Sequence, residues 1–149
     1  MGQSPEGKFI NSSEDMEFHQ GKIYFGNKFI SDSGIKTLAV SKIAPADSVL
    51  LCVRAPVGKV NITDREICIG RGLAAIKGYC DIPTTFIYFM FQTLEQHFNA
   101  LATGTTFKAI NIATVYNQPI PLPPLAEQER IVKRLNELLP LCKAMKGEA

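Results

Sequence analysis

The C-terminal run of residues 119–139 constrains the fold more than any other stretch, because two incompatible patterns meet in it. Pro121, Pro123 and Pro124 forbid a helix, and the residue before each proline is pushed to extended conformations. After Pro124 strong helix formers follow, with Glu127 near the positive end of the helix dipole. The sequence therefore predicts a rigid extended strut that leads into an amphipathic helix.

The predicted helix carries an apolar stripe at heptad spacing. Its members lie three and four residues apart, with two flanking apolar residues: Gln128, Ile131, Leu135, Leu138, Cys142 and Met145, flanked by Val132 and Leu139. The helix either folds back on its own domain or pairs with a partner helix. For a partner helix, the expected contacts are Ile131, Val132, Leu135, Leu138 and Cys142.

Pro140 interrupts this helical pattern. A proline inside a helix removes a hydrogen bond to the carbonyl four residues earlier, here Asn136, and its ring clashes there. We therefore expect a kink or the end of the regular helix at this position.

Composition limits the class of protein. A chain of 149 residues with 46% hydrophobic content forms one domain plus an appendage rather than a disordered chain. No apolar run is long enough to span a bilayer, and the first residues lack the apolar core of a signal peptide, so we expect a cytoplasmic protein without a membrane partner.

The cysteines argue against a metal site. A zinc site needs ligand pairs at short spacing, and the cysteines have none: Cys52, Cys68, Cys80 and Cys142. Cys52 and Cys68 fall inside apolar runs and are predicted to be core residues with reduced thiols.

Several short strands are predicted in the middle of the chain. Residues 48–53 form a nearly continuous apolar run, typical of a strand buried on both faces. Runs at 59–62, 67–69 and 73–76 are separated by turns rich in Gly, Pro or Asp, which favours an antiparallel or mixed curved sheet. Before them, residues 2–22 are predicted to be an irregular entry with at most one short strand. Residues 23–25 and 28–30 could pair around a Gly-Asn turn.

One long internal helix is predicted from residue 84 to about 102. Its apolar residues recur at helical spacing and are interpreted as core packing: Phe86, Ile87, Met90, Phe91, Leu94, Phe98 and Leu101. Gly104 is placed to stop the helix, and Asn111 can cap a short helix at 112–116. The predicted fold class is therefore α+β, with a small curved mixed or antiparallel sheet packed on one long helix.

No catalytic set stands out in the sequence. Residues 70–72, Gly-Arg-Gly, are the nearest to a cofactor-binding loop, but no helix is predicted after them. The Glu-Gly-Lys at 6–8 lacks the upstream acid of a metal-dependent nuclease, and His19 and His97 lie far apart without an obvious nucleophile. The chain is predicted to be non-catalytic.

Charge is distributed unevenly. The net charge is only +2, but residues 18–80 carry nine bases against four acids, which could be a binding face or ordinary solvated surface. DNA recognition needs cations for phosphates and planar or hydroxyl-bearing side chains for base edges. Loops between the predicted elements supply both kinds, and the candidate DNA-binding residues are Arg54, Lys59, Arg71, Thr105, Thr106 and Lys108.

Three segments resemble one family. The run Pro-Leu-Pro-Pro-Leu-Ala-Glu-Gln-Glu-Arg-Ile-Val (121–132) resembles the end of a target recognition domain in specificity subunits of type I restriction-modification enzymes. Gly-Thr-Thr-Phe-Lys-Ala-Ile-Asn (104–111) is similar to the loop after that family's central helix, where its domains approach DNA. Gly-Gln-Ser-Pro-Glu-Gly (2–7) resembles the family's usual entry.

The resemblance implies an architecture and a function. In the family a strand with this proline pattern leads into a long helix. This implies a target recognition domain at residues 1–122 and the start of a coiled-coil type spacer helix at 123–149. Such a domain reads one half of a bipartite double-stranded DNA target.

The resemblance also implies partners. Modification subunits methylate adenine with S-adenosylmethionine, restriction subunits translocate DNA, and this chain itself would need no cofactor. The chain would be a half-length specificity protein that dimerises or part of a two-domain subunit, and the interruption at Pro140 favours the second. The alternative function is a protein-interaction or oligomerisation module that acts through its C-terminal helix without reading DNA.

Overall fold

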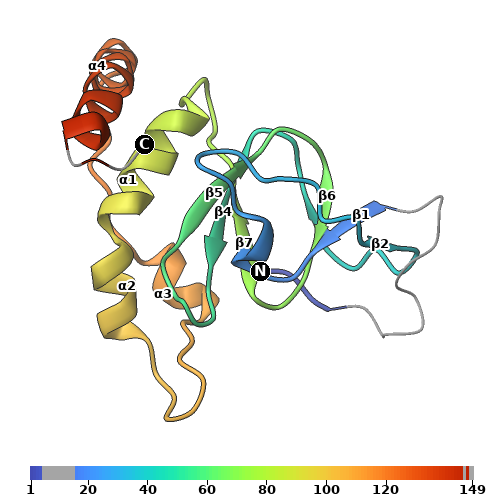
Figure 1. Ribbon diagram of the computed structural model, residues 1–149. Helices are drawn as coiled ribbons and strands as arrows, with labels where there is room; N and C mark the ends of the chain where they lie inside the picture. The colour runs from blue at the N-terminus through green and yellow to red at the C-terminus, as the bar shows by residue number, and fades with distance from the viewer. Residues whose placement is uncertain (5–15, 146, 148–149) are drawn as a thin grey trace.

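Two small β-sheets lie side by side, and helices cover the outer face of one of them (Figure 1). The computed structural model describes residues 1–4, 16–145 and 147. One sheet has the order β2-β1-β6-β3 and the other the order β5-β4-β7. The strands are β1 (Met16–His19), β2 (Lys36–Thr37), β3 (Ile43–Ala44), β4 (Ser48–Cys52), β5 (Val60–Thr63), β6 (Ile67–Ile69) and β7 (Leu73–Ile76). The β1–β6 pair is parallel and the other strand pairs are antiparallel, so the α+β class is confirmed, with two sheets in place of the single sheet expected.

Strand β4 separates the two hydrophobic cores. All five of its residues are buried, as the apolar run predicted. Successive side chains of a strand point to opposite faces. Val49 and Leu51 therefore join the core beneath the helices. Leu50 and Cys52 join the core between the two sheets.

The helices are α1 (Thr84–Thr93), α2 (Glu95–Leu101), α3 (Ile112–Tyr116) and α4 (Leu125–Met145). The expectation of one continuous internal helix is wrong, because Leu94 interrupts it between α1 and α2. Its φ of −88° and ψ of 0° lie in the bridge region, and its N–H donates to the carbonyl of Phe91, which tightens the turn.

The aromatic side chains of α1 and α2 are core residues, as predicted. Phe86, Phe91 and Phe98 are buried, and the rings of the last two stack with their centroids 6.0 Å apart. Fully burying a side chain of this kind contributes on the order of 1.5–3 kcal/mol before entropy is subtracted. Leu101, at the end of the predicted stripe, is instead exposed.

Gly104 does not end the internal helix. Helix α2 stops at Leu101, and Ala102 is already extended. Gly104 has a φ of +117° and lies inside the following loop, where a Cβ would collide with the carbonyl oxygen of Phe107. Two backbone hydrogen bonds between Thr103 and Ala109, of 3.0 and 2.9 Å, close that loop.

Two further expectations concern local structure. The Asn111 cap of α3 is confirmed, because its side chain accepts a hydrogen bond of 2.9 Å from the backbone N–H of Thr114. Residues 22–30 are only partly as expected: Lys22–Tyr24 is a 3₁₀ turn, and a single antiparallel bridge joins Phe25 to Ile30.

The entry segment is only partly described. Strand β1 is the one strand within the described part of the entry, at residues 2–4 and 16–22, as expected. The Glu-Gly-Lys at 6–8 and most of the 2–7 motif lie outside the described residues. None of the helices in the described residues is long and apolar enough to span a membrane.

The segment before α4 is neither helix nor strand, so it is a non-helical connection as predicted, without the strand that the resemblance implied. Helix α4 continues through Pro140 to Met145, so of the two expected outcomes, a kink or the end of the regular helix, the second is wrong. Asn136 and Pro140 are both exposed, so water can satisfy the carbonyl that the proline leaves without a helical partner.

Candidate nucleic-acid interface

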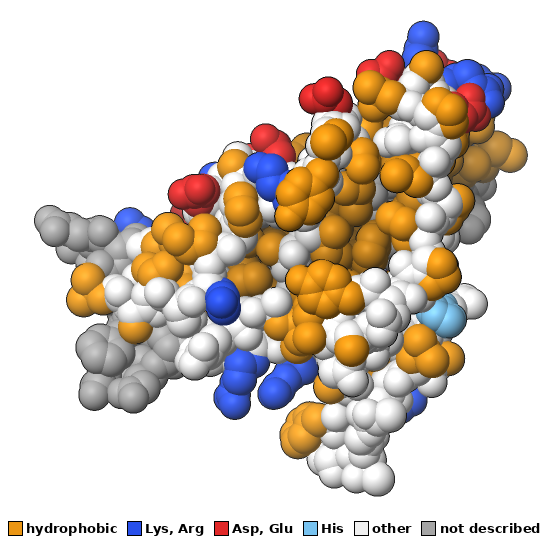
Figure 2. All heavy atoms as spheres, turned by 180° about the vertical axis from the view of Figure 1, so that it is seen from behind, with side chains coloured by type: hydrophobic (Ala, Val, Ile, Leu, Met, Phe, Trp, Pro, Cys, Tyr) orange, Lys and Arg blue, Asp and Glu red, His pale blue; other side chains and the backbone are white. Residues whose placement is uncertain are grey.

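A cavity of about 670 Å³ opens at the junction of the two sheets. Three cationic side chains line it, those of Lys22, Arg54 and Arg71. Within the described part of the chain, no Asp or Glu is among its lining residues. The rest of the wall is mostly apolar and includes Phe18, Ile23, Tyr24, Ile35, Cys52, Pro56 and Phe107. Lys and Arg side chains beside exposed hydrophobic ones are visible in the lower part of the molecule in Figure 2.

Arg54 and the loop that follows α2 are held together by backbone hydrogen bonds. Arg54 forms an isolated antiparallel β-bridge with Ala109, and the N–H of Ala55 donates to the carbonyl of Lys108 at 3.0 Å. The N–H of Ile110 donates to the carbonyl of Val53 at 2.9 Å. Two of the sequence-predicted DNA-binding segments, far apart in the chain, therefore lie side by side.

Arg71 is presented by the tight turn between β6 and β7. The carbonyl of Gly72 accepts from the N–H of Val53 at 2.9 Å, and a Cβ on Gly72 would collide with the carbonyl oxygen of Gln20. The two glycines of this Gly-Arg-Gly turn thus allow close packing of backbones, and a strand follows the turn rather than a helix. Arg71 is exposed at the cavity.

The loop after α2 splits into an exposed tip and a buried end. Thr105, Thr106 and Lys108 are exposed, as a binding role requires. Phe107 is 81% exposed and lines the cavity, whereas Ile110 is 5% exposed and belongs to the core. Ile110 is therefore a structural residue of the core, whereas Phe107 is not.

Of the predicted site residues, Arg54 and Arg71 line the cavity, whereas Lys59, Thr105, Thr106 and Lys108 do not. Lys59 is held elsewhere by an ion pair. Its ammonium lies 2.9 Å from the carboxylate of Glu95 in α2. The side chains are 48% and 34% exposed, so this pair is solvated and contributes little to stability.

The cavity residues that were not predicted as site residues include Lys22, Ile23 and Phe107. Residues 23–25 were interpreted as a possible short strand. The 3₁₀ turn at Lys22–Tyr24, which brings Lys22 and Ile23 to the cavity, is too short to produce a periodic pattern of apolar residues in the sequence. The one available signal for Phe107 in the sequence was its place between Thr106 and Lys108, both candidate DNA-binding residues.

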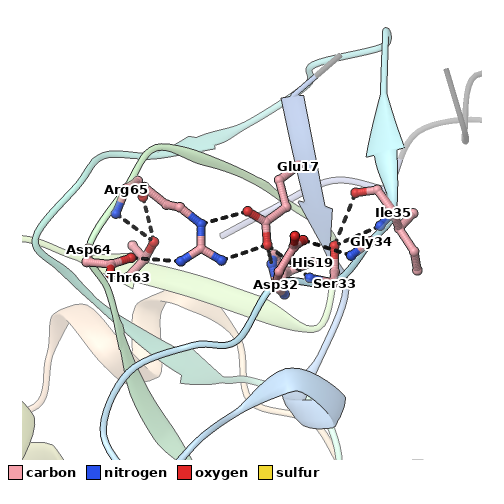
Figure 3. A network of polar contacts seen from close by, with 9 residues as sticks. All are labelled: Glu17, His19, Asp32, Ser33, Gly34, Ile35, Thr63, Asp64 and Arg65. Atoms are coloured by element: carbon pink, nitrogen blue, oxygen red, sulfur yellow. Dashed lines mark hydrogen bonds and ion pairs between the residues drawn. The ribbon is translucent and has the colours of Figure 1, made fainter. Parts of the chain in front are cut away.

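A polar network ties the four-stranded sheet together near β1 (Figure 3). The guanidinium of Arg65 donates two hydrogen bonds to the carboxylate of Glu17, at 2.7 and 2.9 Å, and a third to Asp64. His19, which is fully buried, lies 2.6 Å from the same carboxylate, and the backbone N–H of Ser33 donates to it at 3.1 Å.

The network controls the ionisation of its members. Burial opposes ionisation of Glu17, but the hydrogen bonds from Arg65, His19 and Ser33 outweigh it and lower its pKa to about 2. Burial is the main reason that the pKa of His19 lies below its usual value, although Glu17 opposes that shift.

The contacts of Glu17, His19 and Ser33 indicate a structural role and not a catalytic one. The hydroxyl of Ser33 donates to the carbonyl of Ile35, not to His19, so Glu17, His19 and Ser33 do not form a nucleophile–base pair.

Burial raises the pKa of the Cys52 thiol to about 12, which keeps it neutral. Cys52 and Cys68 are buried as predicted. Residues 1–4, 16–145 and 147 hold no cluster of His, Cys, Asp or Glu that could bind a metal ion.

The apolar stripe of α4 is divided between two environments. Val132 and Leu135 pack against the core that contains α1, and Gln128 is buried with its amide donating to the carbonyl of Pro123 at 2.8 Å. Ile131 is half-buried. The last two turns are exposed and carry Leu138, Leu139, Leu141, Cys142 and Met145. The helix therefore folds back through its first half and leaves the apolar side chains of its second half exposed, although Lys143 there donates a hydrogen bond of 2.8 Å to the side chain of Asn27.

Similar proteins point to one family. Residues 1–148 match the family model described as type I restriction modification DNA specificity domain. The chain is 37% identical over 150 residues to a putative type I restriction enzyme MjaX specificity subunit of Methanocaldococcus jannaschii, which covers 99% of this chain and 35% of that protein.

Solved structures agree with the sequence match. The HsdS subunit from Thermoanaerobacter tengcongensis superposes with a TM-score of 0.86 at 35% identity, over 98% of this chain and 36% of that one. A chain from a structural study of assembly and conformational transition of the type I R-M system superposes with a TM-score of 0.87 at 37% identity, over 98% of this chain and 36% of that one. The chain thus spans about a third of the length of these relatives, and it belongs to the family of type I restriction modification DNA specificity domains.

Proposed function

We propose that this chain recognises one half of a bipartite double-stranded DNA target for a type I restriction-modification complex and is not itself catalytic. The observation that carries this proposal is the cavity in which Lys22, Arg54 and Arg71 meet without a carboxylate, beside the exposed tip at 105–108. Cations that neutralise phosphates release counterions and dominate affinity for DNA. Exposed hydroxyl and planar side chains on the adjoining loop can contact base edges.

The proposed partners follow from membership of the family. The relatives are specificity subunits by name. We propose that modification subunits bind S-adenosylmethionine and methylate the target adenine, that restriction subunits cleave, and that this chain binds no cofactor. Within this proposal residues 1–122 form the target recognition domain and residues 123–149 begin the spacer helix. The cytoplasm, where DNA and these subunits meet, is the proposed location.

The uncovered half of α4 is the proposed site of helix pairing. Leu138, Cys142 and Met145 are exposed and repeat at spacings of four and three, which suits a coiled-coil seam. A second recognition domain's spacer helix, or the same helix of another copy, would cover them.

Lys108→Ala should weaken binding of the chain to all DNA sequences alike. Lys108 is exposed and lies next to Ala109, which closes the loop and bridges Arg54, so its ammonium is expected to contact one phosphate. Losing one phosphate contact should reduce the slope of log affinity against log salt by about one unit. Fluorescence anisotropy of a labelled duplex between low and moderate salt measures this slope.

Lys133→Ala is the matched control, because Lys133 is also exposed but lies on α4. It should leave the slope unchanged. Equal affinity and equal slope for Lys108→Ala and the parent would remove Lys108 from the contact set. Salt-independent retention, or no retention, of DNA by the parent would contradict the proposed function and favour a module that acts through its C-terminal helix.

The purified chain should transfer no methyl group to DNA. Incubation with labelled S-adenosylmethionine and target DNA is expected to give incorporation only after a modification subunit is added. Reproducible transfer by the chain alone, after repeated purification, would contradict the proposed division of roles.

A further inference from the structure

We propose that Phe107 and Ile23 are base-reading contacts that pack on the C5-methyl group of a thymine in the major groove, while Lys22, Arg54 and Arg71 hold the flanking phosphates. This inference rests on the proposed function and adds to it the chemical feature that the cavity recognises.

The first observation is exposure. Phe107 is 81% and Ile23 is 86% exposed, although both are large apolar side chains. They lie far apart in the sequence and yet line one cavity. Exposed apolar side chains that gather in one place, rimmed by polar groups, mark contact surfaces on soluble proteins.

The second observation is that both side chains stand on defined backbone. Phe107 lies in the loop closed by the Thr103–Ala109 pair. Ile23 lies in the 3₁₀ turn, where the N–H of Phe25 donates to the carbonyl of Lys22 and the N–H of Ser31 donates to the carbonyl of Tyr24, both at 2.9 Å. A side chain on a fixed support loses less entropy when it binds.

The third observation is the chemistry of the wall. Phe107 and Ile23 can neither donate nor accept a hydrogen bond through their side chains. Among the four bases, thymine alone presents a methyl group on its major-groove edge, beside the hydrogen-bonding groups that every base carries there. An apolar contact on a base edge in that groove therefore selects thymine.

The cations complete the assignment. Lys22, Arg54 and Arg71 line the same cavity as the apolar pair, with no carboxylate among the described lining residues, so these cations can hold the phosphates that flank a groove. The cations would therefore determine the affinity for DNA and its salt dependence, and Phe107 and Ile23 would determine the base preference at one or two base pairs.

The test pairs a change in the DNA with a change in the protein. A duplex bound by the chain is selected from a randomised pool, and each thymine is then replaced by uracil, which removes only the methyl group. At one or two positions binding should weaken about fourfold, the equivalent of burying one methyl-sized group. At the other thymines the replacement should have no effect.

The protein variant identifies the partner of that methyl group. Phe107→Ala should weaken binding of the thymine duplex and abolish the thymine–uracil difference at one of those positions, as a double-mutant cycle requires of groups in contact. Ile23→Ala should do the same at the same or the adjacent position. Neither variant should change the salt slope, because neither removes a charge.

Tyr79→Ala is the matched control, since Tyr79 is 85% exposed and does not line the cavity. It should keep both the affinity and the thymine–uracil difference. The inference would be overturned if no thymine had a methyl group that affects binding, or if the thymine–uracil difference survived in both Phe107→Ala and Ile23→Ala. A Phe107-dependent rise in 2-aminopurine emission within the site would also overturn it, because it would show insertion between bases instead. Salt-dependent binding by the parent in any of these cases would leave the proposed function standing.

Discussion

Glu17→Ala should lower the free energy of unfolding by about 3 kcal/mol, because it removes the common acceptor of a charged hydrogen-bond network. The carboxylate receives two hydrogen bonds from Arg65, one from the backbone of Ser33 and a contact from buried His19. Without it, the His19 ring keeps no hydrogen-bond partner within the described residues. The half-exposed guanidinium of Arg65 is partly rescued by water, which keeps the expected loss below that of a fully buried pair.

The same network predicts how stability depends on pH. The pKa of Glu17 is lowered from 4.5 to about 2, so its stabilisation is fully present above about pH 4.5 and is lost as the pH falls toward 2. The pKa of His19 is lowered by burial, so protonation in the unfolded state adds a loss of stability as the pH falls below about 6.5. Glu17→Gln should flatten the pH dependence between 4.5 and 2 in urea unfolding.

Glu66→Ala is the control for both measurements, since Glu66 is an exposed acid next to Arg65 in the sequence. It should change stability by no more than about 0.5 kcal/mol. Equal urea midpoints for Glu17→Ala and Glu66→Ala would show that the network contributes nothing to the fold.

Local patterns in the sequence predicted which helices and strands form better than they predicted where those elements end. The apolar run at 48–53, the Asn111 cap and the aromatic stripe of the internal helix each arise from neighbours in the chain, and each was confirmed. The break at Leu94 has no glycine or proline to announce it, and the end of α2 at Leu101 precedes the glycine that seemed to mark it.

The candidate site depends on contacts between distant segments. Arg54 meets Lys108 because residues after β4 pair with residues before α3, and Arg71 reaches the same cavity through the β6–β7 turn. No periodicity encodes such pairings, so sequence reasoning named these three residues separately. Nor could the sequence show that Lys59 lies away from the cavity, because its ion pair with Glu95 depends on packing between the β4–β5 region and α2.

The environment of α4 was likewise set by tertiary packing. The heptad pattern gives the same weight to Leu135 and Leu138, but α1 covers only the first half of the stripe. Leu135→Asp should therefore destabilise the domain, by about 1–3 kcal/mol, because it places a charge against the core. A substitution at this position cannot test pairing without disturbing the fold.

Replacing Leu138 and Leu141 together by Asp should abolish helix pairing and leave the fold intact. Leu138 is 38% and Leu141 is 60% exposed, so a carboxylate at either position can reach solvent. In a paired helix Leu138 lies in the predicted seam and Leu141 lies beside it, next to Cys142. Uncompensated carboxylates at these positions would be desolvated against the partner, which is costly. Sedimentation equilibrium should show the parent associating with rising concentration and the double variant remaining monomeric, while both melt at the same temperature.

Asn136→Asp is the matched control for charge, because Asn136 is exposed on the same helix but lies outside the predicted seam. It should associate like the parent. A parent chain that stays strictly monomeric at high concentration would exclude pairing between two copies of this helix. Pairing with the spacer helix of a second recognition domain then predicts that mixing the two gives a complex that the Leu138→Asp, Leu141→Asp chain cannot form. If the double variant binds that second domain as tightly as the parent does, the exposed half of α4 is not a pairing surface.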